Sequence, residues 1–248
     1  MDWFINIQVS RKKHNITINN TDILNVVSVG QFLLIFIIIK DKYYFILFKT
    51  PFTIVTLIPN WIAIIIDPNY APAYVFRGNA YSALKNYAEA IIDYTKGITI
   101  DPEYTYGYQA RGDTYVDLEN YEDAIADYTR AIIINPEYKY AYLSRGDVYD
   151  DLELYEEALA DFTKAVRIDP DYTVAYNNRG IVFGKKENYN EAIADFNRAI
   201  RINPDYTNAY ANRGFAKELA GLSYCSDYKK ACDLGEEWCC ESYNEDCK

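Results

Sequence analysis

One motif returns every 34 residues through most of this 248-residue chain, and its spacing constrains the fold more than any other feature. The motif is an Asp-Pro or Asn-Pro pair followed two residues later by tyrosine. Its prolines are Pro68, Pro102, Pro136, Pro170 and Pro204. A repeat of this length indicates helical hairpins that stack along one axis. We therefore expect an all-α fold, a right-handed α-solenoid of about five hairpins.

Each repeat also carries glycine, alanine and aromatic residues at fixed places. Small residues let two helices approach closely, and aromatic side chains fill the gaps between larger ridges. These residues are therefore expected in the core: Gly78, Gly112, Gly146 and Gly180, Ala90, Ala124, Ala158 and Ala192, and Tyr94, Tyr128, Phe162 and Phe196. The first helix pair is predicted over about 71–84 and 87–100, with a tight turn near Asn86 that recurs near Asn120, Leu154 and Asn188.

These residues, in this order, resemble the tetratricopeptide repeat family from roughly Asp67 to Leu234. The resemblance implies hairpins whose first helices line a concave groove, where partners of the family usually bind. It also divides the chain into segments: a hydrophobic N-terminal segment outside the repeat pattern (1–60), the remnant end of a preceding repeat (61–70), four repeats (71–104, 105–138, 139–172 and 173–206), a degenerate fifth repeat (207–234) and a cysteine-rich C-terminal cap (235–248).

The repeat region is strongly acidic. The whole chain has 25 basic and 36 acidic residues, and residues 1–66 hold six of the basic and three of the acidic ones. The rest of the chain therefore has 19 basic and 33 acidic residues. Such a surface repels phosphate backbones, so nucleic-acid binding is disfavoured and a basic partner is expected.

The N-terminal segment allows three interpretations. Ile23 to Ile39 is an uncharged stretch of 17 residues, the lower limit for a membrane span, so it could anchor the chain with Arg11, Lys12 and Lys13 in the cytoplasm. Alternatively, its β-branched and aromatic residues could form a β-hairpin that turns at Lys40-Asp41-Lys42.

The third interpretation is a mis-set start or a shifted reading frame that cuts a repeat short. It arises because residues 63–70 copy the repeat junction at residues 131–138, although the residues before 61 carry none of the pattern. Localisation depends on this choice. The repeats would be exported if the segment is an anchor, and cytoplasmic if it is absent from the native protein.

Arginine precedes each glycine, where the family most often has leucine. The arginines are Arg77, Arg111, Arg145, Arg179 and Arg213, and an aspartate recurs on each second helix at Asp93, Asp127, Asp161, Asp195 and Asp227. The guanidinium fork suits bidentate pairing with a carboxylate. We predict that each arginine meets one aspartate between packed helices and that these ion pairs are structural.

The resemblance places a further set of residues on the concave groove: Tyr106, Gln109, Asp113, Asp117, Tyr140, Leu143, Asp147, Asp150, Asp151, Asn177, Asn178 and Ile181. Family members that bind a C-terminal carboxylate use Lys and Arg at such positions with Asn between them, and only Asn178 and Asn212 match that pattern. The aspartates instead favour a basic or amphipathic segment. The alternative is that they form a solvated surface without a ligand.

All five cysteines lie within the last 24 residues. Two antiparallel helices about residue 236 would place Cys225 opposite Cys247 and Cys232 opposite Cys240, leaving Cys239 free. A Cys232–Cys239 pair, reduced packing cysteines and a zinc site are the alternatives, although no histidine lies nearby. Disulfides would agree with an exported domain, and free thiols with the cytoplasm.

The sequence contains no nucleophile–base arrangement, phosphate loop or specific metal motif, and its one histidine, His14, lies in a polar stretch. We expect no cofactor and no catalysis. The prediction is a protein–protein interaction scaffold that binds a peptide or protein segment. Two alternatives are a membrane-tethered assembly factor and a thiol-redox protein that uses the C-terminal cysteines, which requires an exposed thiol of low pKa.

Overall fold

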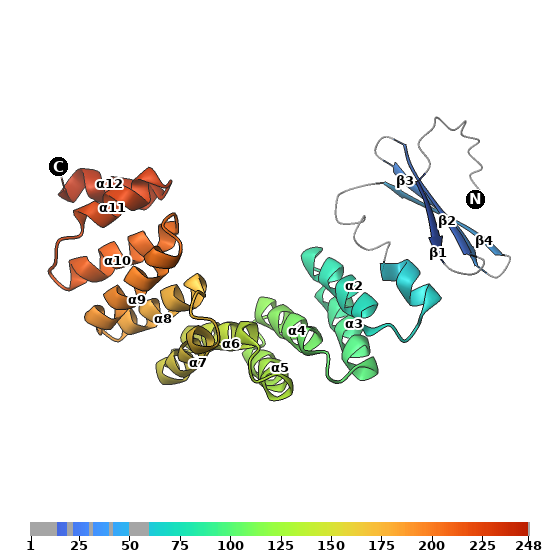
Figure 1. The fold of residues 1–248 in the computed structure, drawn as a ribbon, viewed down its shortest axis with the longest axis horizontal. Helices are drawn as coiled ribbons and strands as arrows, with labels where there is room; N and C mark the ends of the chain where they lie inside the picture. The colour runs from blue at the N-terminus through green and yellow to red at the C-terminus, as the bar shows by residue number, and fades with distance from the viewer. Residues whose placement is uncertain (1–13, 19–21, 30–31, 40–41, 50–59, 248) are drawn as a thin grey trace.

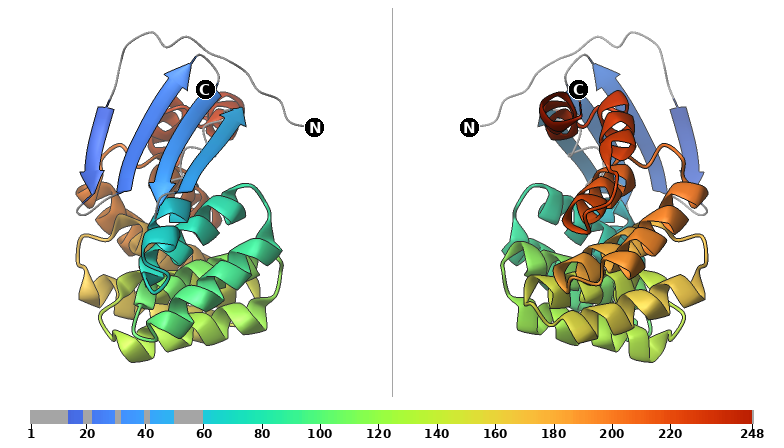
Figure 2. Two further views of the ribbon diagram at one scale, coloured as in Figure 1. Left: turned by 90° about the vertical axis from the view of Figure 1, so that its right-hand side faces the viewer. Right: turned by 90° about the vertical axis from the view of Figure 1, so that its left-hand side faces the viewer.

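The protein is an arc of stacked helical hairpins with a small β-sheet at its N-terminal end (Figure 1). The computed structural model describes residues 14–18, 22–29, 32–39, 42–49 and 60–247. The sheet and the C-terminal helices lie at opposite ends of the arc and rise on the same side of it (Figures 1 and 2). The predicted α-solenoid is confirmed, and from residue 60 to 247 all regular structure is helical.

Each hairpin has a first and a second helix. The first helices are α2 (Ala71–Ala83), α4 (Thr105–Asp117), α6 (Lys139–Asp151), α8 (Thr173–Lys185) and α10 (Thr207–Leu219). The second helices are α3 (Tyr87–Ile100), α5 (Tyr121–Ile134), α7 (Tyr155–Ile168), α9 (Tyr189–Ile202) and α11 (Cys225–Asp233). A closing helix, α12 (Glu237–Asp246), follows α11, and a short helical segment at residues 60–66 precedes α2. Consecutive first helices contact one another, which places them on the inner side of the arc (Figure 1).

The Asp/Asn-Pro motif forms the turn between hairpins. The Oδ1 atom of Asp101 accepts a hydrogen bond from the backbone N–H of Glu103 at 3.1 Å, and the carbonyl of Asp101 accepts one from Tyr104 at 3.1 Å. The intervening proline supplies a fixed φ and needs no partner for an N–H. The same side-chain bond recurs at Asp67, Asn135, Asp169 and Asn203. Short polar side chains followed by proline therefore set the angle between successive hairpins.

The turn within each hairpin depends on a residue with a left-handed backbone. Lys85, Glu119, Glu153 and Glu187 have φ near +60°, and Gly221 has a φ of +69° at the equivalent place. In the first hairpin the N–H of Asn86 bonds to the carbonyl of Tyr81 and the N–H of Lys85 to that of Ser82. This pair of bonds terminates the helix as a Schellman motif, in which glycine is the preferred residue.

The core depends on close contact between glycine and an aromatic ring. A Cβ atom added to Gly146 would lie 2.7 Å from Cε1 of Phe162, and Gly78, Gly112 and Gly180 meet their own partners Tyr94, Tyr128 and Phe196 at the same distance. The helix alanines Ala90, Ala124, Ala158 and Ala192 have no exposed surface. The predicted roles of the repeated small and aromatic residues in packing are therefore met by the structure.

The N-terminal segment contains an antiparallel sheet in the order β1 (His14–Ile18), β2 (Asp22–Val29), β3 (Phe32–Ile39) and β4 (Lys42–Lys49). Ile35 of β3 pairs with Val26 on one side and Ile46 on the other. Residues 23–29 and 32–39 are therefore strands, which contradicts the interpretation of 23–39 as a helical membrane span. The antiparallel pairing of β3 with β4 agrees with the alternative interpretation, a β-hairpin. None of the helices in the part of the chain that the structure describes combines the length and apolar composition needed to cross a bilayer.

Candidate functional site

The structure brings every predicted arginine into contact with its predicted aspartate. Nε and Nη2 of Arg145 donate to Oδ2 and Oδ1 of Asp161 at 2.7 and 2.8 Å, and Asp161 is only 5% exposed. The same two-bond geometry links Arg77 to Asp93, Arg111 to Asp127, Arg179 to Asp195 and Arg213 to Asp227. Burial opposes the charge of Arg145, but the hydrogen bonds and the charge of Asp161 outweigh it, so the pKa of Arg145 is raised.

A third hydrogen bond from each of the three middle arginines reaches the preceding hairpin. Nη1 of Arg145 donates to Oγ1 of Thr129 at 2.8 Å, Arg111 bonds to Thr95 at 2.8 Å, and Arg179 bonds to Thr163 at 3.1 Å. Each of these arginines therefore joins three helices from two hairpins. These threonines also recur at the 34-residue period, although they are not among the predicted site residues.

The two ends of this series differ from its middle. At the first arginine the threonine position is taken by Trp61, whose ring centroid lies 4.2 Å from the guanidinium carbon of Arg77. At the last, Asn197 replaces threonine as the partner of Arg213. Asp227 also accepts a hydrogen bond from Lys217 at 2.7 Å, so two cations surround it. Trp61 thus completes the series at the N-terminal end by a cation–π contact.

The predicted groove residues lie on α4, α6 and α8, on the inner side of the arc (Figure 1). Asp113, Asp117, Asp151 and Tyr140 are exposed, and Tyr106, Gln109, Asp147 and Asp150 are half-buried. Leu143 and Ile181 are half-buried because they pack against aliphatic and aromatic core residues of the repeats. The inner surface is therefore acidic and aromatic.

One predicted groove residue requires correction. Asn177 is only 3% exposed, so it supports the surface from beneath and does not line it. Its amide joins a chain of hydrogen bonds: Asn212 donates to Asn177 at 3.0 Å, Asn177 to Asn178 at 3.2 Å, and Asn178 to Asp147 at 2.8 Å. Both Asn178 and Asn212 are thus committed to internal partners, unlike the ligand-binding asparagines that the resemblance suggested.

Two inner carboxylates, Asp113 and Asp147, have raised pKa values. Both lie on first helices, where Asp147 is half-buried and Asp113 is exposed. Burial raises the pKa of Asp147 to about 6, with smaller contributions from Asp151, Asp150 and Asp113, against the lowering effect of the Asn178 hydrogen bond. Burial likewise raises the pKa of Asp113, although Tyr128 donates a hydrogen bond to it at 2.7 Å. A positive charge nearby would relieve both costs.

Among the described residues, one predicted groove aspartate forms an ion pair. Nζ of Lys185 lies 2.7 Å from Oδ1 of Asp150. Within residues 60–247, no lysine or arginine forms an ion pair with Asp113, Asp117, Asp147 or Asp151. The inner surface therefore carries uncompensated negative charge over α4 and α6.

The cysteine tail closes the C-terminal end. Disulfides join Cys225 to Cys247 and Cys232 to Cys240, with Cα–Cα distances of 5.7 and 4.7 Å, and link α11 to the end of the chain and to α12. Cys239 is free but has no exposed surface, and burial raises its pKa to about 11. It therefore lacks the exposure and low pKa that the thiol-redox hypothesis requires. Among the described residues, no group of His, Cys, Asp or Glu is placed to hold a metal ion.

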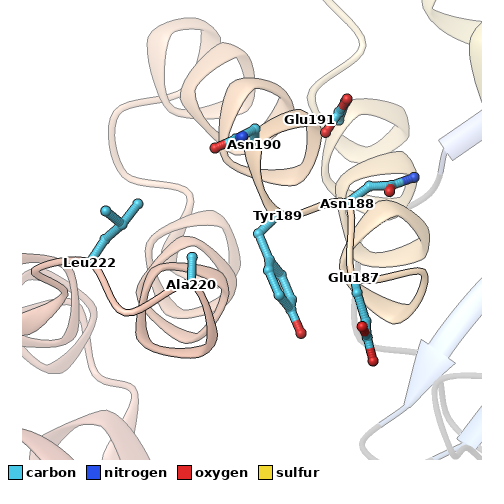
Figure 3. A pocket seen from close by; sticks show the side chains of 7 residues that line it. All are labelled: Glu187, Asn188, Tyr189, Asn190, Glu191, Ala220 and Leu222. Carbon is cyan, nitrogen blue, oxygen red and sulfur yellow. The ribbon is translucent and has the colours of Figure 1, made fainter.

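A cavity of about 400 Å³ lies between the α8–α9 turn and the end of α10 (Figure 3). Its lining is Glu187, Asn188, Tyr189, Asn190, Glu191, Ala220 and Leu222. Backbone turns and exposed side chains form most of this lining, and none of the predicted site residues belongs to it. The candidate site is therefore the open inner surface of the arc.

Comparison with known proteins agrees with this architecture. Family models described as tetratricopeptide repeat match residues 71–104, 110–173 and 173–206, more than half of the chain. None of the curated proteins compared with this chain matches it.

Solved structures give the same result for the fold. YrrB, described as a TPR protein with an unusual peptide-binding site, has a TM-score of 0.60 at 21% identity over 75% of this chain and 97% of its own. One MamA structure has a TM-score of 0.60 at 22% identity over 73% of this chain and 98% of its own. Another has a TM-score of 0.59 at 24% identity over 65% and 95%. At these identities the similarity establishes a shared fold.

Proposed function

The chain belongs to the tetratricopeptide repeat family, and on that premise we propose that it is a noncatalytic scaffold that binds a basic peptide or protein segment on the inner surface of its arc. The ligand would lie across α4 and α6. Asp113, Asp117, Asp147 and Asp151 would meet its positive charges, and Tyr106 and Tyr140 would contact its carbon chains.

The observation that carries this proposal is the contrast in charge compensation on the inner surface. Asp150 has Lys185 as a partner, whereas the other four inner aspartates have no lysine or arginine partner in the part of the chain that the structure describes. The raised pKa values of Asp113 and Asp147 indicate that burial disfavours their charge. A cationic ligand would recover that free energy on binding, and its approach would be accelerated by the net charge of −11.

The test is the affinity of a fluorescein-labelled hexalysine peptide, measured by anisotropy at low and at physiological salt. The variant Asp113→Lys with Asp147→Lys should weaken binding by about a hundredfold or more, because two attractive charges become repulsive. The milder variant Asp113→Asn with Asp147→Asn should weaken it by about tenfold.

A matched control reverses two charges elsewhere. Glu89 on α3 and Glu157 on α7 are exposed on second helices, away from the inner surface. Glu89→Lys with Glu157→Lys changes the net charge by the same amount and should leave the affinity within about twofold of the original. Equal losses in both double variants would mean that only the overall charge attracts the peptide, and the proposed groove would be rejected.

A further inference from the structure

One lysine of this chain already lies in an aromatic box at the edge of the inner surface. Nζ of Lys139 lies 5.2 Å from the ring centroid of Tyr140 and 4.7 Å from that of Tyr172, and it donates a hydrogen bond to Asp169. Hydrogen bonding to Asp169 raises the pKa of Lys139, and the same bond lowers that of Asp169. The two rings and the carboxylate together hold an ammonium group.

The preceding junction has tyrosines at both of these repeat positions but lacks the lysine. Thirty-four residues earlier, Tyr106 and Tyr138 take the places of Tyr140 and Tyr172, whereas Thr105 stands for Lys139 and Asn135 for Asp169. The hydroxyl of Tyr138 donates to Gln109, which lies one turn after Tyr106 on the same face of α4. Both rings therefore border the same part of the inner surface.

Two neighbours extend this second pair of rings. Phe76 and Tyr104 lie 6.3 and 6.2 Å from Tyr106, measured between ring centroids. Burial raises the pKa of Tyr138, and the nearby Tyr106 and Asp113 raise it further. Asp113 lies one turn after Gln109 on the same face of α4. Its carboxylate can therefore supply the negative charge that Asp169 supplies to Lys139. Among residues 60–247, no lysine or arginine lies over the ring of Tyr106 or Tyr138.

From this juxtaposition we propose that Tyr106, Tyr138 and Asp113 form a subsite for a lysine side chain of the ligand, equivalent to the box that Lys139 fills one repeat later. This subsite rests on the proposed function. It specifies in addition that one ligand side chain is a lysine and that this lysine binds beside Tyr106 and Tyr138. Lys139 of the chain itself fills the box of Tyr140 and Tyr172. Of the two boxes that the repeat pattern provides, the one at Tyr106 and Tyr138 is therefore open to a ligand.

The test exchanges the two boxes without changing the net charge. Thr105→Lys with Asn135→Asp copies the filled box into the open one, and Lys139→Thr with Asp169→Asn does the reverse. Since the substituted residues occur at equivalent positions in the native chain, both variants should keep the fold, as judged by circular dichroism and thermal unfolding. The first should weaken hexalysine binding by about five- to tenfold, and the second should strengthen it by about threefold.

The next junction provides the matched control. Thr173 and Asn203 occupy the same repeat positions, but Val174 replaces the first tyrosine, so only Tyr206 remains of the box. Thr173→Lys with Asn203→Asp makes the same chemical change and should leave the affinity unaltered.

The subsite and the groove fail in distinguishable ways. If Thr105→Lys with Asn135→Asp binds hexalysine as the original does, the subsite is overturned. If that happens while Asp113→Lys with Asp147→Lys abolishes binding, the groove stands without it. If neither variant loses affinity, both proposals are wrong.

Discussion

The aspartates of the second helices and those of the inner surface carry the same chemical group in opposite settings. Asp161 is buried, and the guanidinium of Arg145 donates a hydrogen bond to each of its oxygens. Asp147 is half-buried and accepts a hydrogen bond from the amide of Asn178. The repeat thus provides an arginine beside Asp161 and a neutral amide beside Asp147. The aspartates of the second helices are therefore paired with an arginine of their own hairpin, whereas Asp147 has no lysine or arginine partner among the described residues.

The largest effect is expected at the structural carboxylate. Asp161→Ala leaves the guanidinium of Arg145 buried without its counter-charge and should lower the free energy of unfolding by about 3 kcal/mol. Urea denaturation followed by circular dichroism measures the change. A loss as small as that from an exposed aspartate such as Asp151→Ala would show that the pairs contribute nothing to stability.

A change of opposite sign is expected at the inner surface. Burial raises the pKa of folded Asp147 from 3.8 to about 6, so the folded state binds the proton more tightly than the unfolded chain. The free energy of unfolding should therefore fall as the pH rises from about 4 to 6 and stay lowered above that. Asp147→Asn should remove this dependence and stabilise the protein by about 1–2 kcal/mol at pH 7.

The pH profile of this variant provides the check. Stability curves of the original protein and the Asp147→Asn variant should converge toward pH 4 and separate above pH 6. Parallel curves over that range would mean that Asp147 ionises as a normal surface carboxylate, and the contrast between the two classes of aspartate would lose its electrostatic basis.

The geometry of the pair can be separated from its charge. Arg145→Lys keeps a positive charge but cannot bond to both oxygens of Asp161 and to Thr129 together, so it should cost about 1 kcal/mol. The measurement is again the urea midpoint, with Lys96→Arg as a control at an exposed lysine on α3. Full stability of Arg145→Lys would show that charge alone suffices.

The smallest effect concerns the bond between hairpins. Thr129→Val removes the hydroxyl that accepts from Nη1 of Arg145 and should cost about 0.5 kcal/mol. The triple change of Thr95, Thr129 and Thr163 to Val should cost about three times as much, because the sites lie in different hairpins. Thermal unfolding of the single and triple variants gives both values. A triple variant as stable as the original would show that the threonine hydroxyls do not contribute to stability.

Much of the repeat region could be predicted because its period fixes which residues face each other. The motif spacing placed the first helix pair within one residue of α2 and α3. It also identified the arginines and aspartates that the structure pairs, since recurrence at 34 residues puts each pair in the same setting. The disulfide partners followed from a similar symmetry about the turn between α11 and α12.

The remaining features depend on contacts that a linear pattern does not contain. Asn177 appeared accessible from its repeat position, but its burial results from packing against neighbouring helices. The left-handed residues Glu119 and Glu153 gave no signal because glycine is the usual mark of that conformation. The box around Lys139 combines residues from two hairpins. The four-stranded sheet lies outside the periodic pattern, and only its β3–β4 hairpin was among the interpretations of the N-terminal segment.

Arg111, Arg145 and Arg179 each draw their hydrogen-bond partners from two hairpins, which affects how the stack comes apart. In a one-dimensional model of folding, stability divides between the intrinsic stability of each unit and the coupling between neighbours. Opening one hairpin removes a threonine from the arginine of the next, so a boundary between folded and unfolded units is penalised. Unfolding of one hairpin should then be coupled to the unfolding of several neighbours. The inner surface over α4 and α6 should therefore fold and unfold cooperatively.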